Sequence, residues 1–459
     1  MFTLPTETAE RLRALFPDHL RHVVRGVQRA LADLGLDAVA LHSGATVSKT
    51  RFDDQSWPFR PLPPFAHLAP LSEPDAVVVV TSSGDVTLHR CPNLNFWEGP
   101  LELPLDLVSG HFDVRVHRSV EALSAALPRG ARSAVVTEDF AQATRLGFSP
   151  EALNPPALLK VLDTLRVLKT PYEVACLAEA NRRAALGHAA VAQLFRQGAE
   201  ASELELHLAF LKATGQDDPE TPYKNILALG ANAATLHHVS YGRRPSSRQS
   251  ESLLVDAGAT CMGYASDITR TYARGPSSDA ALSTFQQLVR GVDALQRRLC
   301  DEVALDLPYE ALHDRSHDLL GALLAETGVV RCGADEAVAS GLTRVVLPHG
   351  LGHSLGLCTH DAGCAELRPR ADNPFLRNTT RIAAGQVFTI EPGVYFIEML
   401  LAPLRGEPRG ALVNWALVAQ LAPLGGVRVE DDLHVLADGR ADNLTRAYLA
   451  SMEDDERSR

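Results

Sequence analysis

The spacing of apolar residues along the chain predicts helices in both halves. Apolar residues recur at helical intervals from His19 to Leu34, and Gly35 ends the run. The same spacing predicts helices over residues 279–300 and 309–328.

Two more helices are expected where a capping residue is followed three positions later by a glutamate, because the two residues bind each other's backbone N–H groups. Thr170 and Glu173 form such a pair, with proline at the first helical position, and predict a helix to about Phe195. The sequence SELE from Ser202 predicts a second one, which ends at Gly215.

Short apolar and β-branched runs predict the strands. In the first part they cover residues 37–44 and 131–139, and residues 75–90 form a hairpin around a Ser-Gly-Asp turn. The proline-rich stretch 51–74 is expected to be a loop without regular structure. In the second part the predicted strands are 226–229, 252–256, 263–272, 387–391 and 427–431.

This order of elements predicts two domains. Helices and strands alternate in the first part, which favours an α/β domain over residues 1–160. Residues 161–459 are expected to form an α+β domain, with helices outside a mostly antiparallel sheet.

Composition narrows the class of protein. The 459 residues are 46% hydrophobic and 22% charged, with a net charge of −12 and no run of Lys or Arg, which argues against nucleic-acid binding. Neither a signal peptide nor a membrane-spanning segment is expected. The seven cysteines are scattered and include no CxxC pair, so we expect a reducing compartment, the cytoplasm.

Candidate chemistry is concentrated in the stretch from Arg344 to Asp361, where His349, His353 and His360 lie among glycines. Neutral imidazole binds divalent first-row metals and also moves protons near neutral pH. Three such histidines suit one metal ligand with flanking acid/base groups. A histidine-containing turn without metal is the alternative, because the HxxxH spacing is weak evidence without acidic partners.

Two aspartates are the first candidate acidic partners. Asp256 ends an apolar run and Asp267 follows eleven residues later, so two strands joined by a glycine-bearing turn would set their carboxylates side by side. A carboxylate at the buried end of a strand needs a counter-charge or a metal. Pairing with Arg270 or Arg274 is the alternative to metal binding.

Two glutamates extend the set. Glu391 follows a β run, and Glu430 lies in another. Strand alternation places Arg428 on the same face as Glu430, where it would steady that carboxylate, and we count Arg428 among the catalytic residues. For each glutamate alone, a salt-bridged strand end is the alternative.

Together, two aspartates, two glutamates and one histidine make a hard, mainly oxygen-donor cage, which suits Mn, Mg, Co or Zn. Four converging carboxylates require two divalent cations to compensate their repulsion. Two such cations would hold a bridging hydroxide and polarise a carbonyl.

In this order, these residues resemble the pita-bread metallopeptidases (methionine aminopeptidase, aminopeptidase P and prolidase), and above all the bacterial-type prolidases, which are Xaa-Pro dipeptidases. The resemblance covers nearly the whole chain. Its motifs include LHSG, FDDQSWPF, TPYEVACLAEAN, PYKNILALGANAATLHH, LLVDAGA, YASDITRTYA, HGLGHSLGLCTHD, LRNTTRI, TIEPGVYFIEMLLAP, GGVRVEDD and NLTR.

The resemblance implies a role for each metal ligand. Asp256 would chelate one metal, and Asp267 and Glu430 would bridge both. His353 and Glu391 would complete the second metal site, and Glu391 would also act as the general base. The metals would be two divalent ions per chain, Mn²⁺ first, with Co²⁺ or Zn²⁺ as alternatives.

It also implies substrate contacts. His349, His360 and His237 match active-site histidines beside the metals. Arg377 matches the arginine that holds the carboxylate of a C-terminal proline. Tyr223 resembles a residue of the substrate pocket.

The fold implied by the resemblance is a ribonuclease-H-like N-terminal domain of the creatinase type, followed by a pita-bread catalytic domain. A homodimer is also implied, in which Asp54 reaches the neighbouring subunit's site. The substrate would be a small dipeptide. Cys358 and Thr359 depart from the family's usual residues before His360, which bears on substrate preference.

Three alternatives to a prolidase stay open. Aminopeptidase P acts on longer peptides, although Arg377 favours a dipeptide. A metal-free, creatinase-like enzyme or a binding protein would have lost several of the five ligands. Hydrolysis of organophosphate triesters is a possible side activity of the same centre.

Overall fold

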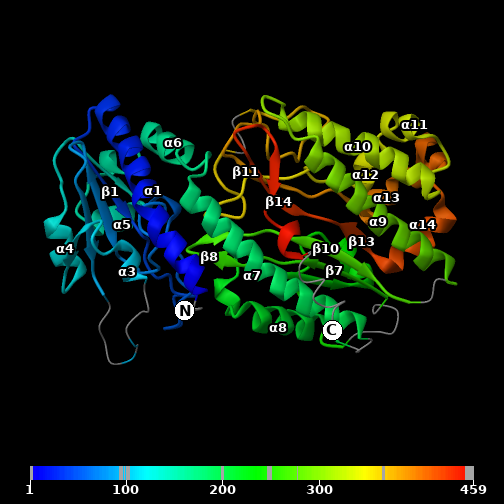
Figure 1. Ribbon diagram of the computed structural model, residues 1–459, viewed down its shortest axis with the longest axis horizontal. Helices are drawn as coiled ribbons and strands as arrows, with labels where there is room; N and C mark the ends of the chain where they lie inside the picture. The colour runs from blue at the N-terminus through cyan, green and yellow to red at the C-terminus, as the bar shows by residue number, and fades with distance from the viewer. Residues whose placement is uncertain are drawn as a thin grey trace. The chain divides into compact units, whose positions relative to one another are not determined.

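The computed structural model describes residues 4–92, 97, 99, 104–197, 201–244, 251–275, 278–363 and 367–449. The chain divides into two compact units, Met1–Cys176 and Leu177–Arg459 (Figure 1). The boundary predicted between residues 160 and 161 falls within helix α6 (Pro156–Thr164), ahead of this division. Among the helices that the structure describes, none combines the length and the hydrophobicity that a membrane span requires.

A mixed sheet of five strands forms the centre of the N-terminal unit, in the order β4-β3-β2-β1-β5. The strands are β1 (Ala38–His42), β2 (Val77–Thr81), β3 (Val86–Arg90), β4 (Asp113–Val116) and β5 (Ser133–Val136). β1 runs parallel to β5 and antiparallel to β2, and β2 and β3 form the predicted hairpin. All residues of β1 and β5 are buried, as their continuous apolar runs require.

Helices cover both faces of this sheet. The unit contains α1 (Thr6–Asp33), α2 (Pro63–Ala66), α3 (Leu105–Val108), α4 (Val120–Ala126), α5 (Phe140–Arg145) and α6. One face packs Val77 and Val79 against Leu123 of α4 and Ala143 of α5. α1 packs against β2 and α6.

Two expectations for this unit were incomplete. α1 begins at Thr6, well before His19, and continues through Pro17. Its first turns bury only Leu12 and Phe16, so their helical pattern is weak in the sequence. The stretch 51–74 was expected to lack regular structure, but α2 forms one turn at Pro63–Ala66, because prolines are compatible with the first positions of a helix.

The C-terminal unit is built from small antiparallel sheets. Their orders are β10-β7-β6, β11-β14-β15, β12-β13 and β8-β9. The strands are β6 (Ile226–Leu229), β7 (Ser252–Asp256), β8 (Thr260–Cys261), β9 (Tyr264–Ala265), β10 (Thr269–Ala273), β11 (Val387–Ile390), β12 (Gly393–Tyr395), β13 (Gly426–Arg428), β14 (Asp431–Val435) and β15 (Ala441–Asn443).

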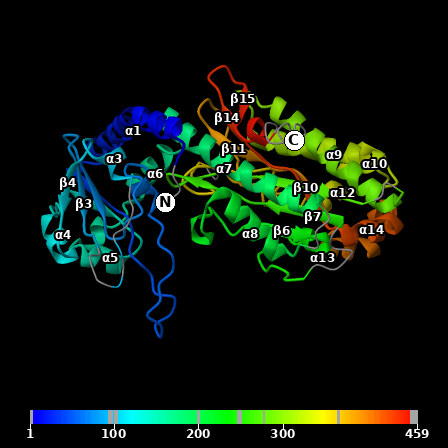
Figure 2. The same cartoon turned by 60° about the horizontal axis from the view of Figure 1, so that its bottom comes forward.

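Helices lie outside these strands, as predicted. They are α7 (Pro171–Arg196), α8 (Glu203–Thr214), α9 (Ala280–Asp301), α10 (Tyr309–Glu326), α11 (Ala334–Ala339), α12 (Leu342–Val346), α13 (Glu398–Leu401) and α14 (Trp415–Leu421). Figures 1 and 2 show α7 beside α8 and α9 beside α10. α7 and α8 pack against β6 and β7, and α9 and α10 pack against β11 and β14.

Two predicted strands are interrupted where candidate ligands lie. The expected strand 263–272 is broken between β9 and β10, which leaves Asp267 outside a ladder. The expected strand 427–431 is broken between β13 and β14, and Glu430 occupies the gap. A single bridge between Thr269 and Glu430 joins the two strand systems at this point.

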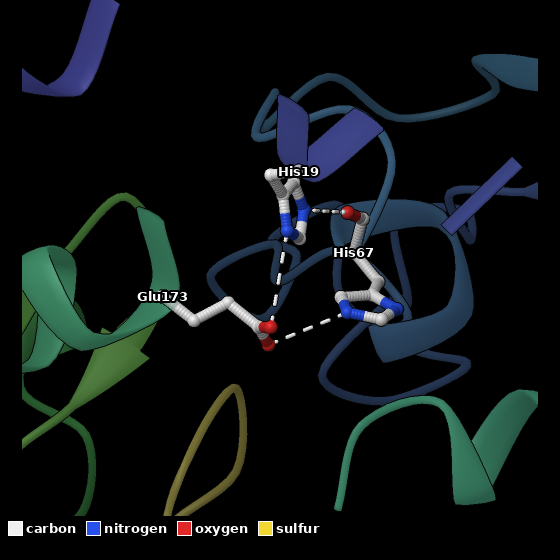
Figure 3. A group of neighbouring side chains, drawn as sticks. All are labelled: His19, His67 and Glu173. Atoms are coloured by element: carbon white, nitrogen blue, oxygen red, sulfur yellow. Dashed lines mark hydrogen bonds and ion pairs between the residues drawn. The ribbon is translucent and has the colours of Figure 1, made fainter. Parts of the chain in front are cut away.

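A buried polar cluster ties α1 and α2 to the start of α7 within the N-terminal unit (Figure 3). His19 uses Nε2 on the carbonyl oxygen of His67 (2.7 Å) and Nδ1 on the hydroxyl of Thr170 (2.8 Å). Oε2 of Glu173 accepts the backbone N–H of Thr170 at 2.8 Å, and Oε1 lies 3.3 Å from Nε2 of His67. The capping box predicted for α7 is therefore present.

Burial sets the charge of His19. Desolvation, reinforced by the charge of His67, lowers the pKa of His19 to about 4, so this imidazole is neutral at neutral pH. Burial alone would raise the pKa of Glu173, but the charge of His67 and its hydrogen bond to the carboxylate prevail and lower it.

We predict that His19 makes the N-terminal unit acid-sensitive. An unfolded histidine titrates near 6.5 and the folded one near 4, so the unfolded chain takes up the proton first. Stability is therefore complete above pH 6.5 and is lost as the pH falls towards 4, by about 2 kcal/mol at pH 5 for this residue. His19→Gln retains a donor and an acceptor but does not titrate. Urea unfolding followed by circular dichroism at pH 7 and pH 5 should show a smaller loss for the variant, and equal losses would contradict the prediction.

Candidate metal centre

Two aspartates reach the candidate site from neighbouring strands. Asp256 is the last residue of β7 and pairs with Thr269 of β10 on one side and Ile226 of β6 on the other. Asp267 lies just before β10. Burial raises the pKa of Asp256 against the opposing charge of Arg428, and the charge of Asp267 adds to the rise. The two carboxylates therefore lie close enough to interact electrostatically.

The alternative partners of the aspartates are engaged elsewhere. Arg270 pairs with Asp431 at 2.6 Å. Arg274 donates to the backbone carbonyl of Phe195. Neither interaction neutralises Asp256 or Asp267.

His353 enters from a loop that runs beside β11. Ser354 forms a bridge with Phe388, and the N–H of Thr389 donates to the carbonyl of His353 at 2.9 Å. A Cβ on Gly352 would lie 2.1 Å from the carbonyl oxygen of Thr389, so only glycine permits this approach. Nδ1 of His353 lies 3.1 Å from the carbonyl of Ser354, which leaves Nε2 available to a ligand.

Three carboxylates surround Nε2 of His353. It lies 3.5 Å from Oδ2 of Asp267, 3.7 Å from Oε1 of Glu391 and 3.9 Å from Oε1 of Glu430. Asp267, His353 and Glu430 are all buried, and their donor atoms lie within 4.8 Å of one another. The structure thus brings together four of the five predicted ligands around one point.

Asp256 is connected to this group through Arg428. The guanidinium donates Nη2 to Oδ2 of Asp256, Nε to the hydroxyl of Thr269 (3.1 Å) and Nη1 to the hydroxyl of Tyr395 (2.9 Å). Thr269 in turn donates to Oε2 of Glu430 at 2.7 Å. Arg428 therefore contacts Asp256 directly and Glu430 through Thr269, whereas the sequence suggested only the second relation.

The electrostatics of the cage favour cations. Burial, together with the neighbouring carboxylates, raises the pKa of Glu430 and of Asp256. Burial also raises the pKa of Glu391 to about 7, against the opposing charges of His353 and Arg428. Among the described residues, Oδ1 of Asp256 is buried without a hydrogen-bond partner. A donor set of four carboxylates and one imidazole, with one oxygen unsatisfied, fits divalent metal ions.

The three predicted active-site histidines have different surroundings. His349 uses Nδ1 on the carbonyl of Gly350 (2.8 Å) and Nε2 on the hydroxyl of Tyr395 (2.9 Å), and burial lowers its pKa to about 3. His360 is exposed and stacks edge-on against His353, with ring centroids 4.4 Å apart. Both nitrogens of His349 are therefore occupied within the protein, whereas the position of His360 suits contact with a substrate.

His237 and Arg377 lie near this exposed edge. Burial and the charges of His353 and Arg377 lower the pKa of His360 to about 4, and His237 adds to the effect. Both His237 and Arg377 are exposed. The adjacent His238 is bonded instead to Glu203 at 2.9 Å, which distinguishes the two histidines of the TLHH motif.

The predictions for Tyr223 and Asp54 have different outcomes. The hydroxyl of Tyr223 donates to Oδ1 of Asp267 at 2.5 Å, so Tyr223 orients a candidate ligand. Asp54 is exposed in the N-terminal unit, where its carboxylate accepts from Gln55 at 3.2 Å. Its suggested role at a neighbouring subunit's site stays a prediction.

Two residues that link the ligands, Tyr395 and Thr269, were not predicted from the sequence. They carry no charge, and their strand patterns give no indication that their hydroxyls face the centre. The inward orientation predicted for Arg428 could have indicated them, because a buried guanidinium needs hydrogen-bond acceptors and these must lie on neighbouring strands.

The N-terminal polar cluster does not form part of this centre. Its members His19, His67 and Glu173 also lie close enough to hold a cation. However, both nitrogens of His19 and Oε2 of Glu173 already have hydrogen-bond partners within the unit. We therefore assign that cluster to packing.

The sequence matches two models of known protein families. Residues 175–437 match the family model described as metallopeptidase family M24, and residues 14–164 match the model described as Xaa-Pro dipeptidase, N-terminal domain. The chain belongs to metallopeptidase family M24. All five candidate ligands lie within the M24 match.

Two curated relatives are similar to this chain along nearly its whole length. A Xaa-Pro dipeptidase of Xanthomonas euvesicatoria is 38% identical over 449 residues, which cover 96% of this chain and 99% of the relative. A Xaa-Pro dipeptidase of Aeromonas hydrophila is 39% identical over 445 residues, which cover 94% and 98%.

Solved structures support the fold. Proline aminopeptidase P II from Yersinia pestis aligns with a TM-score of 0.72 at 21% identity, over 95% of this chain and 98% of that one. Aminopeptidase P from Escherichia coli aligns with a TM-score of 0.70 at 20% identity, over 95% and 99%. The predicted architecture, a creatinase-type N-terminal domain followed by a pita-bread domain, is confirmed.

We predict that Arg428→Met destabilises the protein in a way that metal partly reverses. Removing a buried guanidinium leaves Asp256 without its counter-charge and should lower the free energy of unfolding by about 3–5 kcal/mol. Excess Mn²⁺ supplies positive charge at the same place, so the deficit in melting temperature should shrink when the ion is added.

Arg446→Met is the matched control, because Arg446 pairs with the buried Asp431 and not with a predicted ligand. Its deficit should be the same with and without Mn²⁺. If both variants respond alike, the contribution of Arg428 is not tied to the metal centre.

Proposed function

We propose that this M24 protein is a dinuclear-metal dipeptidase that hydrolyses Xaa-Pro dipeptides, a prolidase. The observation that carries the proposal is the buried cage around Nε2 of His353, where Asp267, Glu391 and Glu430 converge within 3.5–3.9 Å. The match of residues 14–164 to a dipeptidase-type N-terminal domain supports the substrate class.

Two divalent ions would be held by Asp256, Asp267, His353, Glu391 and Glu430. When bound, they would polarise the scissile carbonyl and lower the pKa of a water molecule between them. We propose Mn²⁺ as the physiological ion, because oxygen donors dominate the set. Co²⁺ and Zn²⁺ are the alternatives.

Glu391 is proposed as the general base. Its carboxylate lies 3.7 Å from Nε2 of His353 within the cage, so it is placed to accept a proton from the attacking water. His360, exposed beside His353, would then stabilise the tetrahedral intermediate or assist departure of the proline nitrogen. His237 lies near enough to share this role, and His349 would act through its bond to Tyr395.

Arg377 is proposed to bind the carboxylate of the C-terminal proline. It is exposed, and its charge reaches His360 at the open edge of the cage. A guanidinium matches a carboxylate in a bidentate arrangement. Tyr223, which donates to Asp267, would border the same pocket.

We further propose a cytoplasmic homodimer. The segment around Asp54 forms an exposed arm, in which Ser48 bridges Ser56 and the side chain of Phe52 is 89% exposed. Figure 2 shows this blue loop extending away from the sheet of its unit. An arm with an exposed aromatic side chain suits contact with a second chain, where Asp54 would reach the substrate.

The proposed activity predicts a specific dependence on metal and substrate length. Exhaustive chelation should abolish hydrolysis of Ala-Pro, and Mn²⁺ should restore it. Asp267→Asn should reduce the rate by orders of magnitude while the circular dichroism spectrum is retained. Steady-state kinetics on Xaa-Pro dipeptides and Xaa-Pro-Yaa tripeptides would measure this. Full activity after chelation would contradict the metal mechanism, and a preference for tripeptides would favour aminopeptidase P.

The role of Arg377 predicts a substrate-specific loss. Arg377→Ala should lower kcat/KM for free Ala-Pro by about 30- to 1000-fold, as expected for a charge pair worth about 2–4 kcal/mol. Amidated Ala-Pro lacks the carboxylate, so the wild type should already cleave it poorly and the variant should change little. Equal losses on both substrates would assign Arg377 a structural role and would reopen the aminopeptidase P alternative.

A further inference from the structure

The predicted metal ligands are held in position by different hydrogen-bond partners. Thr269 donates to Glu430, Arg428 donates to Asp256, and the carbonyl of Ser354 orients His353. Asp267 lies between β9 and β10, outside the ladder, so no strand partner fixes its backbone. Its N–H donates instead to a side chain, Oδ2 of Asp432, at 3.1 Å.

Asp432 is itself held in a closed ring of hydrogen bonds. Nδ2 of Asn181, on α7, donates to the same Oδ2 at 2.8 Å. Thr445 donates its hydroxyl proton to Oδ1 of Asn181 (2.7 Å) and accepts the backbone N–H of Asp432 (3.0 Å). All three side chains are completely buried.

This ring leaves little rotational freedom. Asn181 cannot flip its amide, because Nδ2 also donates to the carbonyl of Leu177 at 3.0 Å and Oδ1 accepts from Thr445. Asp432 Oδ2 is consequently fixed at the point where Asp267 presents its N–H. The other oxygen, Oδ1, has no hydrogen-bond partner among the described residues, so the contact with Asp267 depends on a single accepting oxygen.

We propose that Asp432, oriented by Asn181 and Thr445, is a positioning residue for Asp267 and thereby sets the affinity of the centre for divalent metal. The inference rests on the proposed function, because it takes Asp267 to be a metal ligand. Partners of this kind typically contribute 10- to 100-fold to metal affinity, because they hold a ligand in its binding geometry before the ion arrives.

The test is calorimetric titration of the metal-stripped, full-length protein with Mn²⁺, together with its melting temperature. Asp432→Ala removes the accepting oxygen and should weaken at least one Mn²⁺ site 10-fold or more. Asp432→Asn keeps a side-chain oxygen that accepts from both partners and should stay within about threefold of the wild type. Asn181→Ala leaves Asp432 in place but unoriented, and its loss should lie between the two.

Asn373→Ala is the matched control. Asn373 is comparably buried and also donates its amide to carboxylates, those of Glu310 and Asp314, but it contacts no predicted ligand. This variant should lower the melting temperature and leave the Mn²⁺ affinity unchanged. If Asp432→Ala does not fold, Asn181→Ala and Thr445→Val provide the same comparison with the carboxylate retained.

Two results would overturn the inference. One is wild-type Mn²⁺ affinity in Asp432→Ala and Asn181→Ala despite lower melting temperatures, which would make the ring structural only. The other is an Asp432→Asn variant as weak as Asp432→Ala, which would mean that charge matters and the accepting oxygen does not. A wild type that binds no divalent ion would instead refute the proposed function. Two bound ions in both the wild type and Asp432→Ala, with equal affinity, would refute this inference alone.

Discussion

Repulsion among buried carboxylates is the constraint on which the catalytic unit depends. Three acidic side chains approach one imidazole nitrogen, a fourth, Asp256, is linked to them through Arg428, and burial raises the pKa of Asp256, Glu391 and Glu430. Such an arrangement persists only if strands and their partners hold each group against its neighbours, and a cation then offsets the electrostatic cost. Asp256 ends β7, and Asp267, Glu391 and Glu430 each lie within two residues of a strand end, so the small antiparallel sheets meet this requirement.

Polar groups next to the ligand cage form a chain of hydrogen bonds in which each donor and acceptor is assigned. The N–H of His349 donates to Gly350, its other nitrogen accepts from Tyr395, Tyr395 accepts from Arg428, and Arg428 donates to Asp256. Every proton in this chain has one assigned acceptor. A change at one end therefore alters the hydrogen bonding of a carboxylate at the other, which connects the histidine loop with β7 although the two are far apart in sequence.

Local patterns made most of this predictable. Asp256 could be recognised because a carboxylate ends a strongly apolar run, and α7 because a capping box with proline marks its start. The start of α1 could not be placed, because its first turns bury only two apolar residues. Which residues pair across the sheets could not be predicted from the sequence either. That Thr269 faces Glu430, or that Asn181 meets Asp432, depends on register between strands and helices more than 150 residues apart.

Helix α7 has a consequence for how the two units can be separated. The capping box at Thr170 and Glu173 lies in the N-terminal unit, while the helix continues to Arg196 in the C-terminal unit and carries Asn181. A catalytic unit cut at Leu177 would begin inside the helix, with uncapped N–H groups and a frayed first turn close to Asn181. Gene fusion or domain exchange within the family would therefore have to transfer residues 170–176 together with the catalytic unit. The segment that must be inherited together is thus longer than the compact C-terminal unit itself.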